Sequence, residues 1–429
     1  MDRNKNNNNN NNNVPKLRFP GFVGEWEEKT ISDIADVLQG FGFPDKYQGQ
    51  TTGDLPFCKV GDISAAVDKE ERIILHAANY VNYSLLPTLH ARPIPEGATI
   101  FAKIGEAIRS NKRIMTGCPC LIDNNAAAVK AKEGESDEFI FYLMLNVNLA
   151  DYAGGIVPSV NKSTVETISV LIPPTIAEQK KIASFLSNID SLIAAQNRIV
   201  AAVKEKKKGL MQQLFPQNGE TTPRLRFPGF SGEWEEKALG EVGTFVRGLS
   251  YNKGEVTQNN KFTLVLRSNN IVQDTAVDCK NGLQFVTKEP SSEQILRKGD
   301  IVICLSNGSS NLVGKSASYE GDYDGVVTVG AFCGIYRSTA PITKYLVQTP
   351  AYKKSIDLIK QGGNGALANL YGREILRLKF YFPSPKEQKK IAECLMALDD
   401  IIVTETNKLE ALKAHKKGLM QQLFPQPSK

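Results

Sequence analysis

The chain is poor in the residues that most catalytic and metal sites require. It has three His among 429 residues, and none of them lies at H-x-x-x-H spacing. Its seven Cys include no C-x-x-C, and Cys118 and Cys120 have no His or second Cys pair nearby to complete a tetrahedral site. We therefore expect free thiols, no metal site and no His-based metal catalysis.

Long apolar runs are also missing. The nearest to one, residues 325–336, contains Thr and Gly and is too short to span a bilayer. Residues 1–13 are polar, nine of them Asn, and lack the apolar core of a signal peptide. We interpret segment 1–14 as a disordered Asn-rich arm and expect a cytoplasmic protein. The net charge of +6 permits an anionic partner but decides little by itself.

What the chain does contain is a long internal repeat. Residues 15–29 return as 223–237 with two differences in 15 positions, 178–183 return unchanged as 387–392, and 207–217 return as 416–426. The offset is 208 for the first segment and 209 for the other two. The sequence therefore consists of two tandem copies of one repeat.

Each copy divides into a globular part and a helical part. The globular parts contain short strand-like runs at 99–104, 165–172, 300–305 and 375–382, between Gly, Asn and Pro breaks, and beyond their opening motif they barely match. We predict globular domains at 15–174 and 223–383, helices at 175–216 and 384–425, a linker at 217–222 and a tail at 426–429.

The helices have clear start and stop signals. Thr175–Glu178 and Ser384–Glu387 read as capping boxes, and Pro216 and Pro425 end the helices. This predicts helices over 176–214 and 385–423, each about 58 Å long. Glu178 and Glu387 are expected to cap these helices rather than to act as paired catalytic carboxylates.

Within both helices, apolar residues alternate spacings of four and three, which is typical of a coiled-coil seam. The seam residues are Ile182, Leu186, Ile189, Ile193, Val200, Val203, Leu210 and Leu214, and Ile391, Leu395, Leu398, Ile402, Leu409, Leu412, Leu419 and Leu423. Polar residues interrupt it at 196 and 207 and at the equivalent 405 and 416. The predicted fold class is α+β: two tandem pseudo-symmetric repeats, each a globular α/β domain followed by a long helix, with the helices pairing as an antiparallel coiled coil.

Three segments resemble motifs of nucleotide-binding or methyltransferase enzymes, but each departs from the motif. Gly308–Ser316 resembles a P-loop, but five residues separate its glycines instead of four, and no helix is expected after it. Gly363–Ala368 matches a dinucleotide fingerprint only formally, because the residues before it are polar. Pro173-Pro174 lacks the flanking residues of the amino-methyltransferase tetrapeptide. We expect no catalytic residue in this chain.

The repeat resembles the specificity subunit of type I restriction-modification systems. The resemblance covers residues 15–426 and is based on Leu-Arg-Phe-Pro-Gly-Phe, Gly-Glu-Trp, Glu-Gln-Lys-Lys-Ile-Ala and Lys-Lys-Gly-Leu-Met-Gln-Gln-Leu-Phe in both copies. It implies that each globular part is a target-recognition domain for one half of a split DNA site, and that the helices dock two methyltransferase (modification) subunits. By the same resemblance, S-adenosylmethionine, ATP and Mg would belong to partner subunits, which methylate adenine N6 and, with motor-nuclease (restriction) subunits, cleave unmodified double-stranded DNA.

Aligning the copies on Gly97 and Gly299 suggests three stretches that carry DNA-reading side chains in each domain. The candidates are Lys59, Lys103, Arg109, Asn111, Lys112, Arg113, Asn161 and Lys162 in the first copy, and Arg267, Asn269, Asn270, Asn307, Ser309, Asn311, Lys315, Asn369, Tyr371 and Arg373 in the second. For each of them a solvated loop is the alternative. The aromatic residues of the opening motifs are expected to pack rather than to stack on bases. A bivalent coiled-coil adaptor or scaffold that binds protein or carbohydrate is the alternative function.

Overall fold

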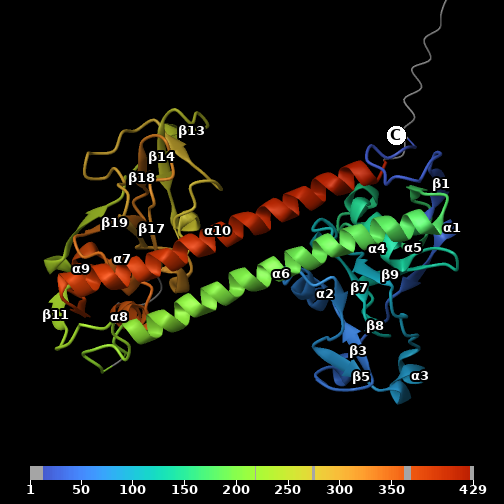
Figure 1. The fold of residues 1–429 in the computed structure, drawn as a ribbon, viewed down its shortest axis with the longest axis horizontal. Helices are drawn as coiled ribbons and strands as arrows, with labels where there is room; N and C mark the ends of the chain where they lie inside the picture. Colours follow the sequence, from blue (N-terminus) through green and yellow to red (C-terminus); the bar gives the residue numbers. More distant parts are fainter. Residues whose placement is uncertain (1–12, 218, 273–275, 362–368, 426–429) are drawn as a thin grey trace, which may run out of the picture. The chain divides into compact units, whose positions relative to one another are not determined.

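The computed structural model describes residues 13–217, 219–272, 276–361 and 369–425. Most of the Asn-rich arm, the Gly363–Ala368 fingerprint and the tail therefore lie outside the described residues. The chain divides into two compact units, one made of Met1–Val200 with Thr404–Lys429 and the other of Ala201–Val403. Each unit contains one globular domain and a part of both long helices (Figure 1).

The long helices are α6 (Ile176–Leu214) and α10 (Pro385–Leu423), with the predicted bounds. In the first unit, Ile182 and Leu186 near the start of α6 share a buried cluster with Leu423 near the end of α10. In the second unit, Leu214 near the end of α6 shares a cluster with Ile391 near the start of α10. Within each unit the helices therefore pack antiparallel, as predicted (Figure 1).

The predicted seam residues form the buried faces of both helices. Those that are buried are Ile182, Leu186, Ile189, Ile193, Val200, Leu214, Ile391, Leu395, Leu409, Leu419 and Leu423, and those that are half-buried are Val203, Leu210, Leu398, Ile402 and Leu412. The heptad spacing is thus confirmed by burial along the described helices.

The first domain combines a five-stranded sheet, in the order β2-β9-β6-β7-β4, with a three-stranded sheet, β5-β3-β8. Its strands are β1 (Glu27–Thr30), β2 (Ala35–Gln39), β3 (Leu55–Cys58), β4 (Ile73–Ile74), β5 (Asn79–Val81), β6 (Thr99–Ala102), β7 (Arg113–Thr116), β8 (Leu121–Ile122), β9 (Ala126–Ala131) and β10 (Ser169–Ile172). Its helices are α1 (Ile31–Ile34), α2 (Val60–Asp68), α3 (Leu86–Leu89), α4 (Asp137–Asn146) and α5 (Lys162–Glu166).

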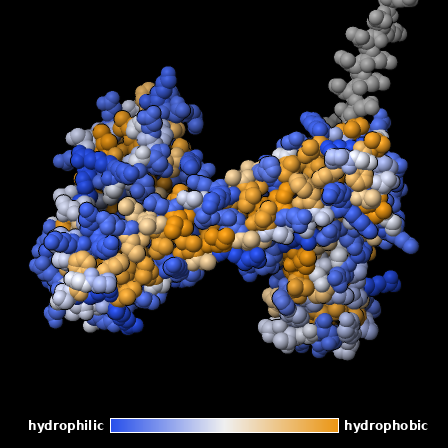
Figure 2. Space-filling model, in the orientation of Figure 1, coloured by the Kyte–Doolittle hydropathy of each residue, from blue (hydrophilic) through white to orange (hydrophobic). Residues whose placement is uncertain are grey.

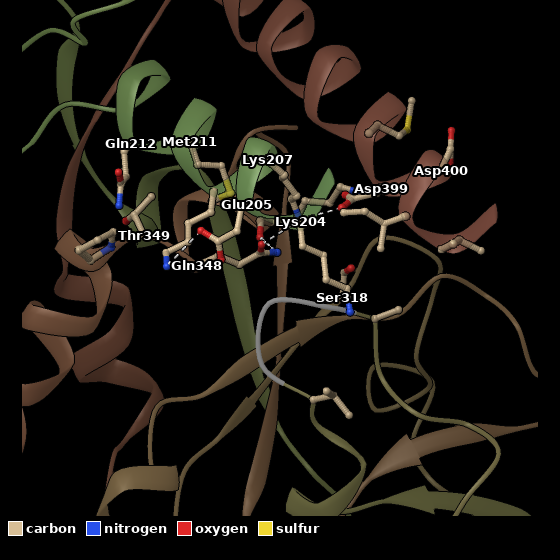
Figure 3. A pocket seen from close by; sticks show the side chains of 18 of the residues that line it. Lys204, Glu205, Lys207, Met211, Gln212, Ser318, Gln348, Thr349, Asp399 and Asp400 are labelled. Atoms are coloured by element: carbon tan, nitrogen blue, oxygen red, sulfur yellow. Dashed lines mark hydrogen bonds and ion pairs between the residues drawn. The ribbon is translucent and has the colours of Figure 1, made fainter. Parts of the chain in front are cut away.

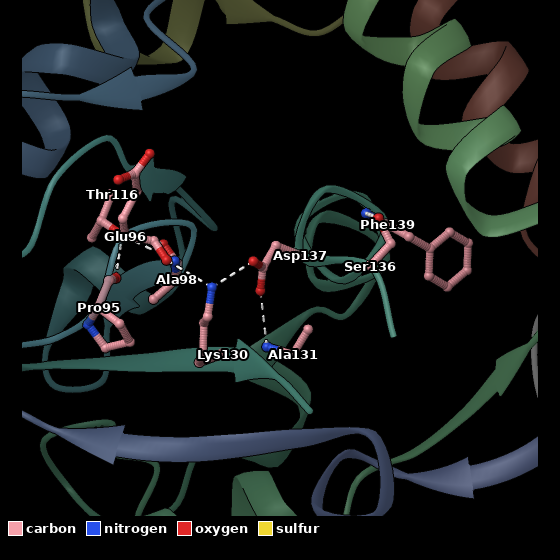
Figure 4. A network of polar contacts seen from close by, with 9 residues as sticks. All are labelled: Pro95, Glu96, Ala98, Thr116, Lys130, Ala131, Ser136, Asp137 and Phe139. Carbon is pink, nitrogen blue, oxygen red and sulfur yellow. Dashed lines mark hydrogen bonds and ion pairs between the residues drawn. The ribbon is translucent and has the colours of Figure 1, made fainter. Parts of the chain in front are cut away.

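Helix α4 fills the space between this sheet and the long helices. Its apolar residues, including Phe139 and Tyr142, are buried in the same cluster as the first half of α6. A polar network fixes its start: Lys130 Nζ on β9 donates to Asp137 at 2.5 Å and to the Glu96 carbonyl at 2.7 Å (Figure 4). Asp137 lies in the first turn of α4, where a carboxylate is favoured by the helix dipole.

The second domain is built of two four-stranded sheets, in the orders β12-β19-β16-β17 and β13-β15-β14-β18. Its strands are β11 (Glu235–Ala238), β12 (Gly243–Arg247), β13 (Val256–Thr257), β14 (Thr263–Leu266), β15 (Phe285–Val286), β16 (Ile301–Cys304), β17 (Ser316–Ser318), β18 (Val327–Val329), β19 (Cys333–Ser338) and β20 (Lys379–Phe382). Its helices are α7 (Thr343–Leu346), α8 (Pro350–Gln361) and α9 (Gly372–Arg377).

Two of the four predicted strand runs need correction. The runs 99–104 and 300–305 contain β6 and β16, as predicted. The runs 165–172 and 375–382, however, begin in the last turns of α5 and α9, and only their second halves are strands. A single apolar residue, Val165 or Ile375, anchors each short helix in the core, and short apolar runs do not distinguish strand from helix.

The ends of each domain are closed by a two-stranded antiparallel sheet. Strand β1 pairs with β10, so the opening motif lies beside the residues that lead into α6. Strand β11 pairs with β20 in the same way, ahead of α10. Among the described residues no helix combines the length and apolar character needed to cross a membrane.

Candidate nucleic-acid interface and its anchors

The repeated motifs at the two ends of each domain meet in a buried ion pair. In the first unit, Arg18 Nε and Nη2 each donate to a Glu178 carboxylate oxygen at 2.8 Å. Arg18 also donates to the carbonyl oxygens of Val23 and Gly24. Glu178 is 1% exposed, and Trp26 Nε1 donates to it at 3.4 Å. The opening motif is thereby fastened to the start of α6.

The second unit repeats the arginine–glutamate pair. Arg226 donates to both oxygens of Glu387 at 2.8 and 2.6 Å and to the carbonyl oxygens of Ser231 and Gly232. The hydrogen bonds with Glu387, which is also 1% exposed, raise the pKa of Arg226. We call these two pairs the anchors. They explain physically why the opening and closing motifs recur together in both copies.

The anchors correct the role predicted for the two carboxylates. Half of each capping box is present, because Thr175 Oγ1 and Ser384 Oγ accept hydrogen bonds from the backbone N–H groups of Glu178 and Glu387. The carboxylates themselves point to Arg18 and Arg226. A buried arginine fork satisfies both oxygens at once, which a single backbone N–H does not.

Each unit also contains a partly buried Lys-Asp-Tyr cluster at a polar interruption of the seam. In the first unit, Lys416 Nζ lies 2.5 Å from Asp190, and the Tyr142 hydroxyl donates to the same carboxylate at 2.6 Å. Lys416 also lies over the Tyr142 ring, 5.4 Å from its centroid. Burial, and then the charge of Asp190, raise the pKa of Tyr142, which keeps its hydroxyl a donor.

The equivalent cluster of the second unit is Lys207, Asp399 and Tyr345. Lys207 Nζ lies 2.7 Å from Asp399, and the Tyr345 hydroxyl donates to Asp399 at 2.8 Å. Lys207, which is 7% exposed, also lies over the Tyr345 ring. Each cluster thus joins a globular domain to both long helices within its unit.

The other seam interruption is also paired. Gln196 Nε2 on α6 donates to the side chain and to the backbone carbonyl of Glu405 on α10, at 2.7 and 2.9 Å. Polar pairs at seam positions typically fix the register of a coiled coil. The described polar residues of the seam therefore contact one another or a domain, rather than solvent alone.

The structure brings together the candidate DNA-reading stretches of the first domain. Lys103, just after β6, donates from its backbone N–H to the Asn125 carbonyl at 2.8 Å and accepts from the Val160 N–H at 2.9 Å. The turn around Asn125 also contacts the first stretch, because the Asp123 N–H donates to the Cys58 carbonyl at 3.2 Å. Segments 59–63, 103–113 and 161–162 therefore surround one turn.

The three stretches of the second domain meet in the same way. Asn307 Nδ2 donates to the Ser268 hydroxyl at 2.9 Å, which joins the segment after β16 to the segment after β14. Ser306 pairs with Asn369, and the Leu370 N–H donates to the Leu305 carbonyl at 2.9 Å. The alignment of the two copies thus located corresponding segments, although their sequences differ.

Two candidate DNA contacts prove to be internal residues. Arg113 is 3% exposed, donates to the carbonyls of Lys112 and Val147 and to Asn111, and lies over the Phe101 ring. Burial lowers the pKa of Arg113 to about 9. Asn270, 1% exposed, donates to the carbonyl oxygens of Asp278 and Asn281. Neither side chain has a free surface toward a base edge, so both assignments are corrected.

The remaining candidates lie at or near the surface. Arg109, Asn161, Lys162, Asn269, Ser309, Asn311, Asn369, Tyr371 and Arg373 are exposed, and Lys59, Lys103, Asn111, Lys112, Arg267, Asn307 and Lys315 are half-buried. Several of the cations are held by nearby acids, such as Lys112 by Asp68 at 2.7 Å. Whether any of them contacts DNA stays a prediction.

Comparison with known proteins identifies the family. The model of the family described as "Type I restriction modification DNA specificity domain" matches this sequence twice, over residues 24–205 and 231–414. The chain belongs to this family. Both matches run from an opening motif into a long helix, so each copy of the repeat is one specificity domain.

The relatives that this chain matches are distant. It is 26% identical to the MjaVIII specificity subunit of Methanocaldococcus jannaschii over 62% of its own length and 64% of the relative's. It is 31% identical to the EcoKI specificity subunit of Escherichia coli over 38% of this chain and 36% of that one. The match to the putative MjaX specificity subunit of M. jannaschii, 23% identical, covers 93% of both chains. The chain thus spans less than two thirds of some of its relatives.

A solved structure agrees with the fold. The S subunit of the type I restriction-modification system of M. genitalium superposes with a TM-score of 0.59 and 14% identity, over 97% of this chain and 100% of that one. At this identity the likeness concerns the fold alone.

Other expectations about this specificity protein can also be compared with the structure. The P-loop-like Gly308–Ser316 is followed by strand β17 and not by a helix, as predicted. Trp26 is 2% exposed and packs edge-on against Phe139 and Phe424, so the opening motif packs rather than presents its rings. Trp234 is buried similarly beside Phe215.

Sequence reasoning missed a large cavity in the second unit. It has a volume of about 870 Å³ and lies between α6, α10, α8 and β17 (Figure 3). Lys204, Met211, Gln348 and Asp399 are among its lining residues. Its residues come from six separate segments, and no local pattern in the sequence brings them together.

Proposed function

We propose that this chain is the non-catalytic DNA-recognition subunit of a type I restriction-modification complex. In this proposal each globular domain reads one half of a bipartite site in double-stranded DNA, and the chain docks two adenine-N6 methyltransferase subunits. The observation that carries the proposal is the repetition of one anchored unit with different surface loops. Two readers on equivalent supports suit a site with two different halves.

The proposal leaves the chemistry to other chains. S-adenosylmethionine would bind to the methyltransferase subunits, and ATP and Mg to the motor-nuclease subunits of the full complex, in the cytoplasm. The residues of this chain would position the DNA. Direct readout requires a few Arg, Lys, Asn or Gln side chains at a groove, which the exposed candidates supply.

The long helices offer a surface for the methyltransferases. On α6, Leu192 is 58% and Ile199 47% exposed, and on α10, Ile401 is 45% and Val403 58% exposed. Figure 2 shows apolar side chains exposed along these helices. Leu192 and Ile401 occupy equivalent positions of the two repeats, so they offer similar contacts to two identical partners.

Genome-wide mapping of N6-methyladenine, with and without this gene, tests the proposal. The methyltransferase subunits are kept in both strains. We expect one bipartite motif to lose its methylation when the gene is removed. An unchanged methylation map would favour the adaptor or scaffold function instead.

Exchange of one domain tests whether each globular domain reads one half of the motif independently. Replacing residues 30–170 with the equivalent domain of another family member should change one half of the motif and leave the other half unchanged. The matched exchange of residues 238–379 should change only the second half. A single exchange that altered both halves would contradict independent reading by the two domains.

A further inference from the structure

The loop before α5 carries an apolar tip that the fold leaves uncovered. Ile156 is fully exposed, and Val157 is 61% exposed. Of the large hydrophobic residues that the structure describes, Ile156 is the most exposed. Single exposed apolar residues are common on protein surfaces, but two adjacent ones at the tip of one loop suggest a contact with a partner.

This loop, residues 154–159, is held in a defined conformation by its backbone. The N–H groups of Gly154 and Ser159 each donate to the other residue's carbonyl at 3.1 Å, which closes the loop. The Gly105 N–H donates to the Pro158 carbonyl at 2.8 Å. Gly155, with φ of +91°, allows the turn that a side chain would strain. The tip is therefore built to present Ile156 and Val157 outward.

The 154–159 loop is attached to the candidate DNA-reading segment. Its base pairs with residues 103–105, and exposed cations lie on the adjoining segments. Arg109 lies on one side in an exposed ion pair with Glu106 at 3.2 Å, and Lys162 lies on the other side in an ion pair with Glu166 at 3.5 Å. Cations suit the phosphate backbone, while an apolar tip requires a dry surface, such as the faces of stacked bases. This combination of charge and apolar surface fits duplex DNA.

We propose that the 154–159 loop is an apolar wedge that enters the half-site read by the first domain and unstacks one base step there. The inference rests on the proposed function. Ile and Pro are among the side chains that DNA-binding proteins insert between bases, and the β-branched Ile156 and Val157 have few rotamers to lose on insertion. The corresponding residues of the second domain, 362–368, lie outside the described residues, so the inference concerns the first domain.

Fluorescence of 2-aminopurine tests the wedge, because this base brightens when it loses its stacking neighbours. The probe is a duplex oligonucleotide with the mapped motif, carrying 2-aminopurine at each position of the first half-site in turn. It is titrated with the complete complex of this chain and its methyltransferase, without S-adenosylmethionine. The target adenine is left out of the comparison, because a methyltransferase moves that base by itself.

We expect brightening at one step with the wild-type complex. The double variant Ile156→Ala, Val157→Ala should lose this signal and bind the duplex about tenfold more weakly, while its motif stays the same. The matched control is Val23→Ala, since Val23 is 83% exposed and belongs to the opening motif rather than to a candidate segment. An unfolding midpoint equal to that of wild type would show that the loop variant is folded.

Three results would overturn the wedge in distinguishable ways. An unchanged signal and affinity in the double variant would show that the tip does not enter the DNA. A loss of affinity on replacing thymine by uracil, without any change in stacking, would identify a contact with a thymine methyl group instead. If the wild-type complex failed to distinguish the motif from unrelated duplex, the proposed function would fail, and the wedge with it.

Discussion

Glu178 and Glu387 are the residues that join segments lying far apart in the sequence. Each is almost completely buried, and each receives both hydrogen bonds of an arginine fork. Burying a charge pair costs desolvation energy, so such a pair contributes little net stability compared with an apolar pair. Substituting only one partner of the pair costs more stability, because the other charge then remains buried without its partner.

The first anchor predicts that a single and a double variant differ in stability. Arg18→Met should destabilise the protein by about 3 to 5 kcal/mol, since it leaves Glu178 buried and unpaired. The double variant Arg18→Met, Glu178→Met should be less destabilised than Arg18→Met alone. Denaturant unfolding of the whole protein measures both.

The control for this variant is an exposed pair of the same type. Arg109 lies 3.2 Å from Glu106, and their side chains are 65% and 80% exposed. Because solvent screens this pair, Arg109→Met should change the free energy of unfolding by less than about 1 kcal/mol. Equal losses for Arg18→Met and Arg109→Met would refute the anchor.

The Lys-Asp-Tyr clusters predict a loss of stability at high pH. Burial raises the pKa of Tyr142 and of Tyr345 above the ordinary value, which is about 10. Their contribution is therefore fully present below pH 10 and is lost as the pH rises above it, because the unfolded chain releases these protons first. The double variant Tyr142→Phe, Tyr345→Phe should show a shallower decline between about pH 10 and 11. Unfolding midpoints measured across this range check it, and equal slopes would count against the clusters.

Which residues could be predicted from the sequence depends on how local their partners are. The seam spacing predicted the apolar contacts of α6 and α10, because the apolar periodicity within each helix is enough to identify its buried face. The polar interruptions Lys207 and Lys416 were visible, but their partners were not. Tyr142 and Tyr345 lie in the divergent domains, where no spacing rule connects them to the helices.

At the scale of elements, the two long helices are where the sequence was most informative. Their capping residues and terminal prolines predicted both ends, since these signals act within one or two turns. The short elements α5 and α9 were mistaken for strand because helices of five or six residues do not complete an apolar period. Tertiary packing of Val165 and Ile375 decides their conformation instead.

Asp substitutions on the seam face and on the exposed face of α6 and α10 should have different effects, because the first face packs the two helices together and the second is proposed to bind the methyltransferase. Ile193 and Ile402 occupy equivalent seam positions, and Ile193 is 4% exposed in the core of the first unit. The double variant Ile193→Asp, Ile402→Asp should lose at least about 3 kcal/mol of stability, because a carboxylate would be buried without a partner, and should lose bipartite recognition. The neighbouring Leu192→Asp, Ile401→Asp should keep its stability and lose affinity for the methyltransferase.

These two variants are measured by thermal unfolding and by co-purification with the methyltransferase subunit. If Ile193→Asp, Ile402→Asp retained both its unfolding midpoint and its split-site recognition, the paired-helix arrangement would be wrong. If Leu192→Asp, Ile401→Asp bound the methyltransferase normally, the proposed docking surface would lie elsewhere.

For the whole molecule, the repeat was the most informative feature of the sequence. It predicted two equivalent domains and two equivalent helices, and the structure has both. The antiparallel pairing predicted for the helices also implies that each unit is completed by a segment of the other repeat's helix, and both units are built in this way. That property depends on long-range contacts such as those of Ile182 with the C-terminal part of α10, which only the folded chain brings together.

Under the proposed function, α6 and α10 act as a ruler for the unread gap between the half-sites. Half-sites read from one face of B-DNA recur about every 34 to 36 Å, and each helix of about 58 Å is long enough for one such step but not for two. The half-sites should therefore lie about one turn apart, centre to centre. Any change in length must remove whole heptads from both helices, or the seam loses its register.

Deleting 193–199 together with 402–408 makes such a change. It removes Gln196 and Glu405 as a pair, leaves both Lys-Asp-Tyr clusters in place, and shortens the helices by about 10 Å, close to three base pairs. The complex should then methylate a motif with a gap about three base pairs shorter, or fail to bind because the second half-site is turned away. The control deletion of 193–199 alone should destabilise the fold. Methylation mapping measures the gap, and undiminished methylation of the original motif at its original spacing would show that the helices do not set it.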